Sequence, residues 1–228
     1  MDVKAFLFDL DGVLTDTAHY HFLAWQQLAV REDLAFNEMV NEHLKGVSRM
    51  ESLEIILRHN SAEAHYSPAQ KLEMTTWKNN RYRELLQNIT PADILPGVAA
   101  FLQDAQAAGL RLAVASASRN AFTVLGLLGL ADSFDYVADA SKITEPKPHP
   151  EVFLNCAAAL GLAPSLCVGV EDAYAGIEAI TRAGMRSVGI NVAEGEIYRP
   201  GISLASTDEL NFAQLLPLLQ ALPCPPAD

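Results

Sequence analysis

Cysteine is scarce in this chain of 228 residues. Cys156, Cys167 and Cys224 are too few and too scattered for a disulfide framework or a zinc site, and we expect them to be small packing residues. The apolar runs fall short of the ~20 residues that a membrane-spanning helix needs, and the N-terminus lacks the pattern of a signal peptide. These absences predict a cytoplasmic protein without membrane attachment.

Basic residues are in the minority. The 16 lysines and arginines are outnumbered by 28 aspartates and glutamates, which gives a net charge of −12. This balance disfavours nucleic acid and anionic membranes as the main partners. Separately, we expect a monomer whose partner is a small molecule. Half of the residues are hydrophobic and 19% are charged, which is typical of a globular protein with a substantial core.

Several segments are almost continuously apolar, as strands buried on both faces of a parallel sheet are. They are residues 3–8, 110–115, 166–170 and 186–190, with 136–138 as a weaker candidate. Apolar residues at helical spacing lie between them. This alternation predicts the α/β class, with a doubly wound parallel-sheet (Rossmann-like) core domain.

A long stretch after the first strand interrupts this alternation. From about residue 17 to 87 the apolar residues follow helical spacing, as in Phe22, Trp25 and Leu28, and turn residues then cluster between Thr90 and Gly97. We therefore expect a core domain of residues 1–15 and 91–228 and an inserted all-helical domain of residues 16–90. The proline-rich end, residues 222–228, is expected to be frayed.

Acidic side chains follow two of the predicted strands. Asp9 and Asp11 come after the first strand, and Glu171 and Asp172 come after a later one. Ligands of open α/β sheets bind at these carboxyl ends, so we expect the side chains to converge. Carboxylates at close range repel one another, and a hard cation such as Mg²⁺, which also bridges to phosphate oxygens, relieves that repulsion. The sequence therefore predicts a Mg²⁺ site that takes a phosphorylated ligand.

Each of these features also has an ordinary structural explanation. Aspartate is common in turns, a serine before a helix is often an N-cap, and an acidic pair is favourable at a helix start. Their joint placement at strand ends favours the functional interpretation. The Ser116 loop is expected to open a helix running toward Gly129, whose free N–H groups suit a phosphate, and Lys147, between Pro146 and Pro148, is expected to supply a fixed cation.

These residues resemble the motifs of the haloacid dehalogenase-like superfamily of phosphotransferases. Asp9-Leu10-Asp11-Gly12-Val13 is similar to the first motif, Ser116 to the second, Lys147 to the third and Glu171-Asp172 to the fourth. The resemblance implies that Asp9 is a nucleophile that becomes an aspartyl phosphate and that Asp11 is the general acid/base. It implies a Mg²⁺ site formed by Asp9, the Asp11 carbonyl, Glu171 and Asp172, a transferring-phosphate site of Ser116, Ala117 and Lys147, and a mobile cap.

The chain is closer still to the sugar phosphomutases of that superfamily, through Asp16-Thr17, His21-Phe22, Ala24-Trp25, the segment 44–49 and the segment 116–120. This implies interconversion of β-glucose 1-phosphate and glucose 6-phosphate through glucose 1,6-bisphosphate. The expected second-phosphate and substrate residues are Gly46, Val47, Ser48, Arg49, Ser118 and Asn120. The expected cap and hinge residues are Thr17, His21, Trp25 and Lys78.

An arginine in the cap suits the second phosphate, because a guanidinium binds phosphate oxygens in bidentate fashion. A Mg²⁺-dependent sugar-phosphate phosphatase with the same four motifs is the main alternative. A non-catalytic sugar-phosphate sensor is a third, which the presence of both Asp9 and Asp11 argues against.

Overall fold

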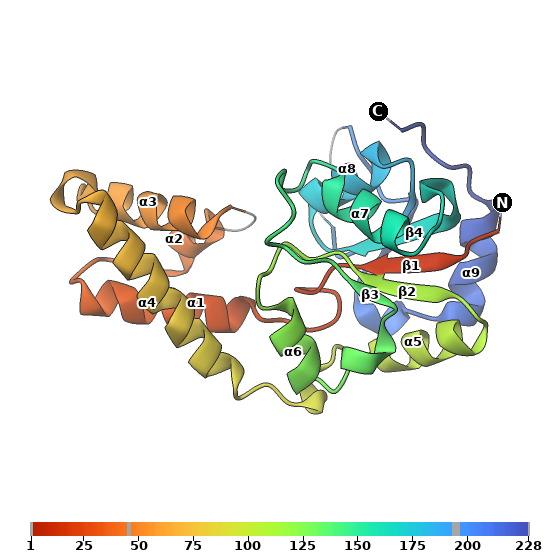
Figure 1. Ribbon diagram of the computed structural model, residues 1–228, viewed down its shortest axis with the longest axis horizontal. Coiled ribbons are helices and arrows are strands. Elements are labelled where there is room, and N and C mark those ends of the chain that lie inside the picture. The colour runs from red at the N-terminus through yellow and green to blue at the C-terminus, as the bar shows by residue number, and fades with distance from the viewer. Residues whose placement is uncertain (1, 45–46, 193–196, 228) are drawn as a thin grey trace. The chain divides into compact units, whose positions relative to one another are not determined.

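The computed structural model describes residues 2–44, 47–192 and 197–227. The chain divides into two compact units, one formed by Met1–Asp16 with Ile89–Asp228 and the other by Thr17–Asn88. The first unit contains a sheet with helices packed on it, and the second is built of helices (Figure 1).

The sheet of the first unit has the strand order β3-β2-β1-β4-β5-β6 and every neighbouring pair is parallel. Its strands are β1 (Ala5–Phe8), β2 (Arg111–Val114), β3 (Tyr136–Val137), β4 (Cys167–Glu171), β5 (Arg186–Ile190) and β6 (Ile202–Leu204). β1 lies in the interior of the sheet, with Leu7 in register with Ala113 on one side and Gly169 on the other. The residues that follow β1 are therefore flanked by the ends of β2 and β4.

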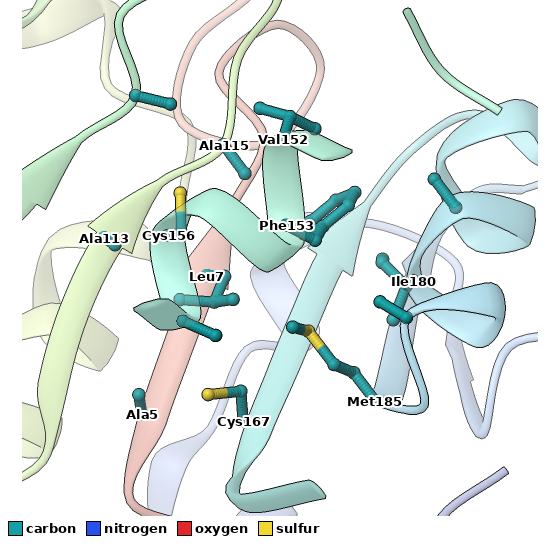
Figure 2. Packing of buried hydrophobic residues seen from close by; sticks show 14 of the residues in the cluster. Ala5, Leu7, Ala113, Ala115, Val152, Phe153, Cys156, Cys167, Ile180 and Met185 are labelled. Carbon is teal, nitrogen blue, oxygen red and sulfur yellow. The ribbon is translucent and has the colours of Figure 1, made fainter. Parts of the chain in front are cut away.

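Alternate residues of β1 are buried on opposite faces of the sheet. Ala5 and Leu7 pack with residues of α7 and α8, such as Phe153 and Ile180 (Figure 2). Phe6 points the other way, and its ring meets that of Phe101 on α5 edge-on at 4.9 Å. Burial on both faces explains why β1 is apolar throughout. The helices of this unit are α5 (Val98–Ala107), α6 (Ala121–Leu127), α7 (Glu151–Ala159), α8 (Tyr174–Arg182) and α9 (Phe212–Ala221).

The second unit contains α1 (Ala18–Arg31), α2 (Glu38–Glu42), α3 (Arg49–His59) and α4 (Pro68–Leu86). Local sequence explains where α4 begins: Ser67 and Gln70 form a capping box and Pro68 occupies the first helical position. Trp25 lies in the buried apolar cluster that joins these helices, as expected. Within the described part of this unit the regular elements are all helical.

The residues on either side of the helical unit are tied to each other. The Thr15 hydroxyl donates to the Asp93 carbonyl at 2.8 Å, and the Leu95 N–H donates to the Leu14 carbonyl at 3.0 Å. Both bonds lie inside the first unit, so the chain leaves and re-enters the sheet unit at hydrogen-bonded neighbours.

The predicted fold class is confirmed, and two details differ from expectation. The short strand β6 was not predicted. The C-terminal segment was expected to be frayed, and this was wrong for the residues that pack: buried Arg186 donates to the Leu222 carbonyl at 3.0 Å, and the Cys224 thiol lies 3.2 Å from the Ser165 carbonyl. None of the helices in the described ranges has the length and apolar content to cross a bilayer.

Candidate active site

Three carboxylates meet at the carboxyl ends of β1 and β4. Asp9 follows β1, and its N–H continues the pairing by donating to the Val170 carbonyl at 2.9 Å. Glu171 is the last residue of β4 and Asp172 follows it. Oxygen atoms of Asp9, Glu171 and Asp172 all lie within 4.8 Å of one another. The parallel pairing of the two strands thus brings together acidic residues that are far apart in the sequence.

Lys147 binds two of these carboxylates. Its ammonium group donates to Asp9 Oδ1 and, at 2.7 Å, to Glu171 Oε2. Hydrogen bonds also close the loop that carries Lys147. The Glu151 carboxylate, after Lys147, accepts from the N–H groups of Thr144 at 3.0 Å and Glu145 at 2.7 Å, which precede it. The lysine is therefore held against the carboxylates by a loop with internal hydrogen bonds.

Two glycines make room for the acidic side chains. Gly12 has φ +77°, and a Cβ there would lie 2.1 Å from Asp172 Oδ2. A Cβ on Gly176 would lie 2.0 Å from the carboxyl carbon of Glu171. A side chain at either position would displace a carboxylate, so both glycines are part of the site.

The Glu171 carboxylate also supports the start of α8. Its Oε1 accepts from the N–H groups of Asp172 at 3.3 Å and Ala173 at 3.2 Å. These two residues lead directly into α8, with Ala173 as its N-cap, so Glu171 fixes the backbone just before the helix. One carboxylate thus meets a lysine, a helix start and the other acids.

The electrostatics of the cluster follow from burial and charge. Burial lowers the pKa of Lys147, but the neighbouring Asp9 and Glu171 carboxylates outweigh it and raise the pKa above its ordinary value. Burial, followed by the charge of Asp9, raises the pKa of Asp172. Burial is also the main reason that the pKa of Glu171 is raised, although Lys147 opposes the shift. Three acids beside one ammonium group are thus short of positive charge.

This shortage of charge fits a metal ion. The donors are carboxylate oxygens, which hard divalent cations prefer, and Gly12 and Gly176 keep the space around them free of side chains. The acidic cluster is therefore suited to hold a divalent cation.

Asp11 and Ser116 follow β1 and β2, two strands that pair with each other in the sheet. Asp11 lies in the turn after β1. A hydrogen bond from the Gly12 N–H to the Thr15 carbonyl, at 2.8 Å, closes this turn. Ser116 is buried two residues beyond the end of β2, the other neighbour of β1. Its hydroxyl accepts from the Ser118 N–H at 3.1 Å.

The Ser116 loop leads into a helix, as expected from the sequence. α6 begins at Ala121, with Asn120 as its N-cap. Ala117 is exposed, and Ser118 accepts from the Asn120 N–H at 3.3 Å. The loop of residues 116–120 therefore connects β2 to α6 and contains its own hydrogen bonds.

A second polar cluster lies inside the helical unit. Lys78 Nζ is 2.8 Å from His21 Nδ1 and lies over the Trp25 ring, 4.8 Å from its centroid. Lys78 and Thr17 are buried. Burial, followed by the charges of Lys78 and Arg49, lowers the pKa of His21, and burial with Arg49 lowers the pKa of Lys78 to about 7. This unit therefore brings Thr17, His21, Trp25 and Lys78 together.

The segment expected to bind the second phosphate precedes and begins α3. Gly46 lies outside the described residues. Val47 is half-buried, and the exposed Ser48 caps α3 by accepting from the Glu51 N–H at 3.2 Å. Arg49 is the first residue of α3 and is half-buried.

Sequence reasoning missed two contributors. Gly176 interrupts a helical pattern, and an isolated glycine in a helix was a usable signal. Tyr82 gave no such signal, because an apolar aromatic position on a helix is usually a packing residue. In the structure Tyr82 is fully buried and its hydroxyl donates to Thr17 Oγ1 at 3.0 Å.

Comparison with known proteins agrees with this geometry. A family model described as haloacid dehalogenase-like hydrolase matches residues 3–184. Beta-phosphoglucomutase of Bacillus subtilis (strain 168) is 45% identical over 188 residues, which is 82% of this chain and 83% of that protein. The crystal structure of beta-phosphoglucomutase from Clostridium difficile is similar with a TM-score of 0.86 and 42% identity, and the match covers 96% of this chain and 97% of that one.

A phosphatase is also among the relatives. Hexitol phosphatase B of Escherichia coli (strain K12) is 30% identical over 220 residues, which is 94% of this chain and 97% of that protein. The chain belongs to the haloacid dehalogenase-like hydrolase family. The resemblance inferred from the four motifs is thereby confirmed.

Proposed function

We propose that this chain interconverts β-glucose 1-phosphate and glucose 6-phosphate through an aspartyl-phosphate enzyme and glucose 1,6-bisphosphate. The observation that carries the proposal is the pair of clusters: Asp9 held by Lys147 among acids in the sheet unit, and a cationic group with Arg49 and Lys78 in the helical unit. A sugar with two phosphates needs a reacting site for one and an anchor for the other. Identity of 45% to a beta-phosphoglucomutase supports the same reaction.

Asp9 is the nucleophile in this proposal. Its carboxylate attacks the phosphorus of the bisphosphate, the bond to the sugar oxygen breaks, and Asp9 keeps the phosphoryl group as an acyl phosphate. Asp11 gives its proton to the departing sugar oxygen. In the reverse direction Asp11 removes the proton from the attacking sugar hydroxyl, so one group acts as acid and as base.

Four groups would hold Mg²⁺: the side chains of Asp9, Glu171 and Asp172 and the backbone carbonyl of Asp11. Their clustered oxygen donors support this assignment. When bound, Mg²⁺ supplies positive charge that offsets the repulsion between the carboxylates and the phosphate.

The transferring phosphate is assigned to Ser116, the Ala117 N–H and Lys147. The raised pKa of Lys147 keeps its ammonium group charged through the neutral range, so it can stabilise the equatorial oxygens during transfer. The second phosphate is assigned to residues on both units, namely Gly46, Val47, Ser48, Arg49, Ser118 and Asn120. Arg49 is the main anchor because its guanidinium can bind two phosphate oxygens.

The two units take different roles. Residues 1–15 and 91–228 form the catalytic core, and residues 16–90 form a cap that excludes water from the acyl phosphate. The cap is supported by Thr17, His21, Trp25 and Lys78. Of these, Thr17, His21 and Lys78 also help to align Asp11. The proposal also includes that the protein is cytoplasmic and monomeric and that its partner is a sugar phosphate.

A Mg²⁺-dependent sugar-phosphate phosphatase is the second candidate. Its support is the 30% identity to a hexitol phosphatase over most of both chains. The two candidates share every step up to the acyl phosphate and differ in what attacks it, a sugar hydroxyl or water.

The test supplies the purified chain with β-glucose 1-phosphate, Mg²⁺ and a trace of glucose 1,6-bisphosphate. We expect glucose 6-phosphate to accumulate well ahead of inorganic phosphate. Rapid phosphate release without glucose 6-phosphate would sink the mutase assignment and favour the phosphatase. Binding of the sugar phosphate without either product would favour a sensor.

A further inference from the structure

Tyr82 is a buried titratable residue that the reaction scheme above does not use. It lies four residues after Lys78 on α4, and Trp25 lies four residues after His21 on α1. Side chains four apart share one face of a helix, so α1 and α4 each present such a pair. Tyr82 is 0% exposed and Lys78 2% exposed. The four side chains thus meet where these two helices pack.

Tyr82 contacts the other members of this cluster through different parts of its side chain. Its ring stacks on His21 with centroids 3.9 Å apart and an interplanar angle of 28°. Lys78 Nζ lies 5.0 Å from the centroid of the same ring. The hydroxyl donates to Thr17 Oγ1 at 3.0 Å. A single residue therefore touches His21, Lys78 and Thr17, which lie on two separate segments.

The hydrogen bond between Lys78 and His21 has two possible directions. When Lys78 is an ammonium ion it donates to Nδ1, so neutral His21 carries its ring proton on Nε2. When Lys78 is a neutral amine it can accept from Nδ1–H, and Nε2 then becomes an acceptor. The protonation state of Lys78 therefore sets what His21 offers on its other nitrogen.

Burial and the Arg49 charge on α3 favour the neutral amine. His21 on α1 is the titratable group hydrogen-bonded to Lys78, and Trp25 and Tyr82 place ring faces near its Nζ. The electron-rich faces of aromatic rings attract a cation, and this attraction is stronger away from water. The two rings therefore act against burial and Arg49.

We propose that Tyr82 is a positioning residue of the reaction: its ring keeps Lys78 as the donor to His21, so that His21 presents an Nε2–H group. This inference rests on the proposed function for its catalytic consequence, but the state of the His21–Lys78 pair can be measured without substrate. The Tyr82 hydroxyl adds a tie to Thr17, the residue that precedes α1.

The test compares two variants of Tyr82. Tyr82→Phe removes the hydroxyl and keeps the ring face, whereas Tyr82→pentafluorophenylalanine keeps a planar aromatic ring, enlarged at its edge, and reverses the charge of its face. The ring nitrogens of His21 are followed by ¹⁵N NMR between pH 5 and about 10 in the full-length protein without substrate. We expect the change from Nε2–H to Nδ1–H at about the same pH in the wild type and the phenylalanine variant.

In the fluorinated variant we expect that midpoint to fall by about one pH unit. The alkaline limb of the pH profile of kcat should move down by the same amount, with KM nearly unchanged. Equal midpoints in the two variants would overturn the proposal, because the ring face would then have no influence on the pair. Both variants keep a planar aromatic ring at position 82, and thermal unfolding checks that the larger fluorinated ring is accommodated.

The two proposals can fail separately. A wild-type chain that releases phosphate and forms no glucose 6-phosphate contradicts the proposed function and leaves the ¹⁵N result standing. Conversely, a mutase whose His21 tautomer does not respond to the ring face contradicts only the role of Tyr82.

Discussion

Each unit holds a lysine that is largely shielded from solvent, with the Lys78 residue 2% exposed and the Lys147 side chain 13% exposed, and the two lysines differ in charge environment. Lys147 lies between the carboxylates of Asp9 and Glu171, whereas Lys78 lies beside a histidine nitrogen and two aromatic rings. Burial lowers the pKa of both. The carboxylates reverse the effect at Lys147 and raise its pKa, but at Lys78 the Arg49 charge adds to burial and the pKa falls to about 7.

The pKa values of the two shielded lysines thus shift in opposite directions, because the charges of their neighbours decide the direction. Lys147 keeps its proton throughout the neutral range, which suits a group that stabilises phosphoryl oxygens. Lys78 is close to half-protonated near pH 7, which suits a group that sets the direction of a hydrogen bond. The predictions below test this contrast.

The largest effect is expected from removing the partner of Lys147. Asp9→Asn removes the proposed nucleophile, so formation of glucose 6-phosphate and release of phosphate should both fall at least about 10³-fold. Arg49→Ala, on the helical unit, should reduce isomerisation much more than phosphate release. Coupled assays of both products measure this, and isomerisation that survives in the Asp9 variant would refute the nucleophile assignment.

Stability should separate the two lysines next. Lys147→Met leaves two buried carboxylates without their cation and should lower the free energy of unfolding by about 3 kcal/mol without Mg²⁺. Lys78→Met removes a buried cation that has no carboxylate partner among the contacts described above, and should leave stability unchanged or higher. Urea unfolding compares the two, and equal losses would show that the contrast is wrong.

The pH dependence of stability should follow Lys78. Its pKa is about 7 in the folded chain against an ordinary value of 10.5, so the unfolded chain binds more protons between these values. Folding stability contributed by Lys78 therefore rises with pH across that window. Between pH 7 and pH 10 the free energy of unfolding of the wild type should rise by at least about 1 kcal/mol relative to that of Lys78→Met.

Urea unfolding at a series of pH values measures that gain. Lys147 is present in both proteins, so its own contribution, which is lost only as pH rises through its raised pKa, cancels in the comparison. A constant difference between the two proteins across the window would show that Lys78 titrates normally.

The smallest effects concern the space beside Glu171, one partner of Lys147. Gly176→Ala should weaken Mg²⁺ binding about tenfold, because the new Cβ would collide with the Glu171 carboxyl group. Gly126→Ala on α6 is the matched control: nothing lies within 4 Å of its Cβ, so it should stabilise the protein by about 0.5–1 kcal/mol. Calorimetric Mg²⁺ titration and thermal unfolding of both variants measure these effects. Equal Mg²⁺ affinity in the two variants would contradict the role of Gly176.

The sheet was predictable because its strands are buried on both faces and so are apolar throughout. β6 was not, because it has three residues, only partly buried, and little pattern. The packing of the C-terminal segment depends on Arg186 and Ser165, which are distant in sequence. A proline-rich composition predicts an open chain and carries no information about such distant partners.

The acidic residues at the strand ends were predictable for a different reason, since parallel strands deliver their carboxyl ends to one edge. Their grouping follows from topology alone, whereas their roles stay predictions. Tyr82 could not be found in this way. Its importance depends on His21 and Thr17, more than sixty residues earlier, and on the packing of α1 against α4.

The hydrogen bonds from Thr15 to Asp93 and from Leu95 to Leu14 close a loop in which the whole helical unit is one uninterrupted insertion. Such an insertion is a replaceable module: a glycine-serine linker in place of residues 17–88 should leave a sheet unit that folds and unfolds cooperatively. Circular dichroism and thermal unfolding of the shortened chain would reveal whether the scaffold is self-sufficient.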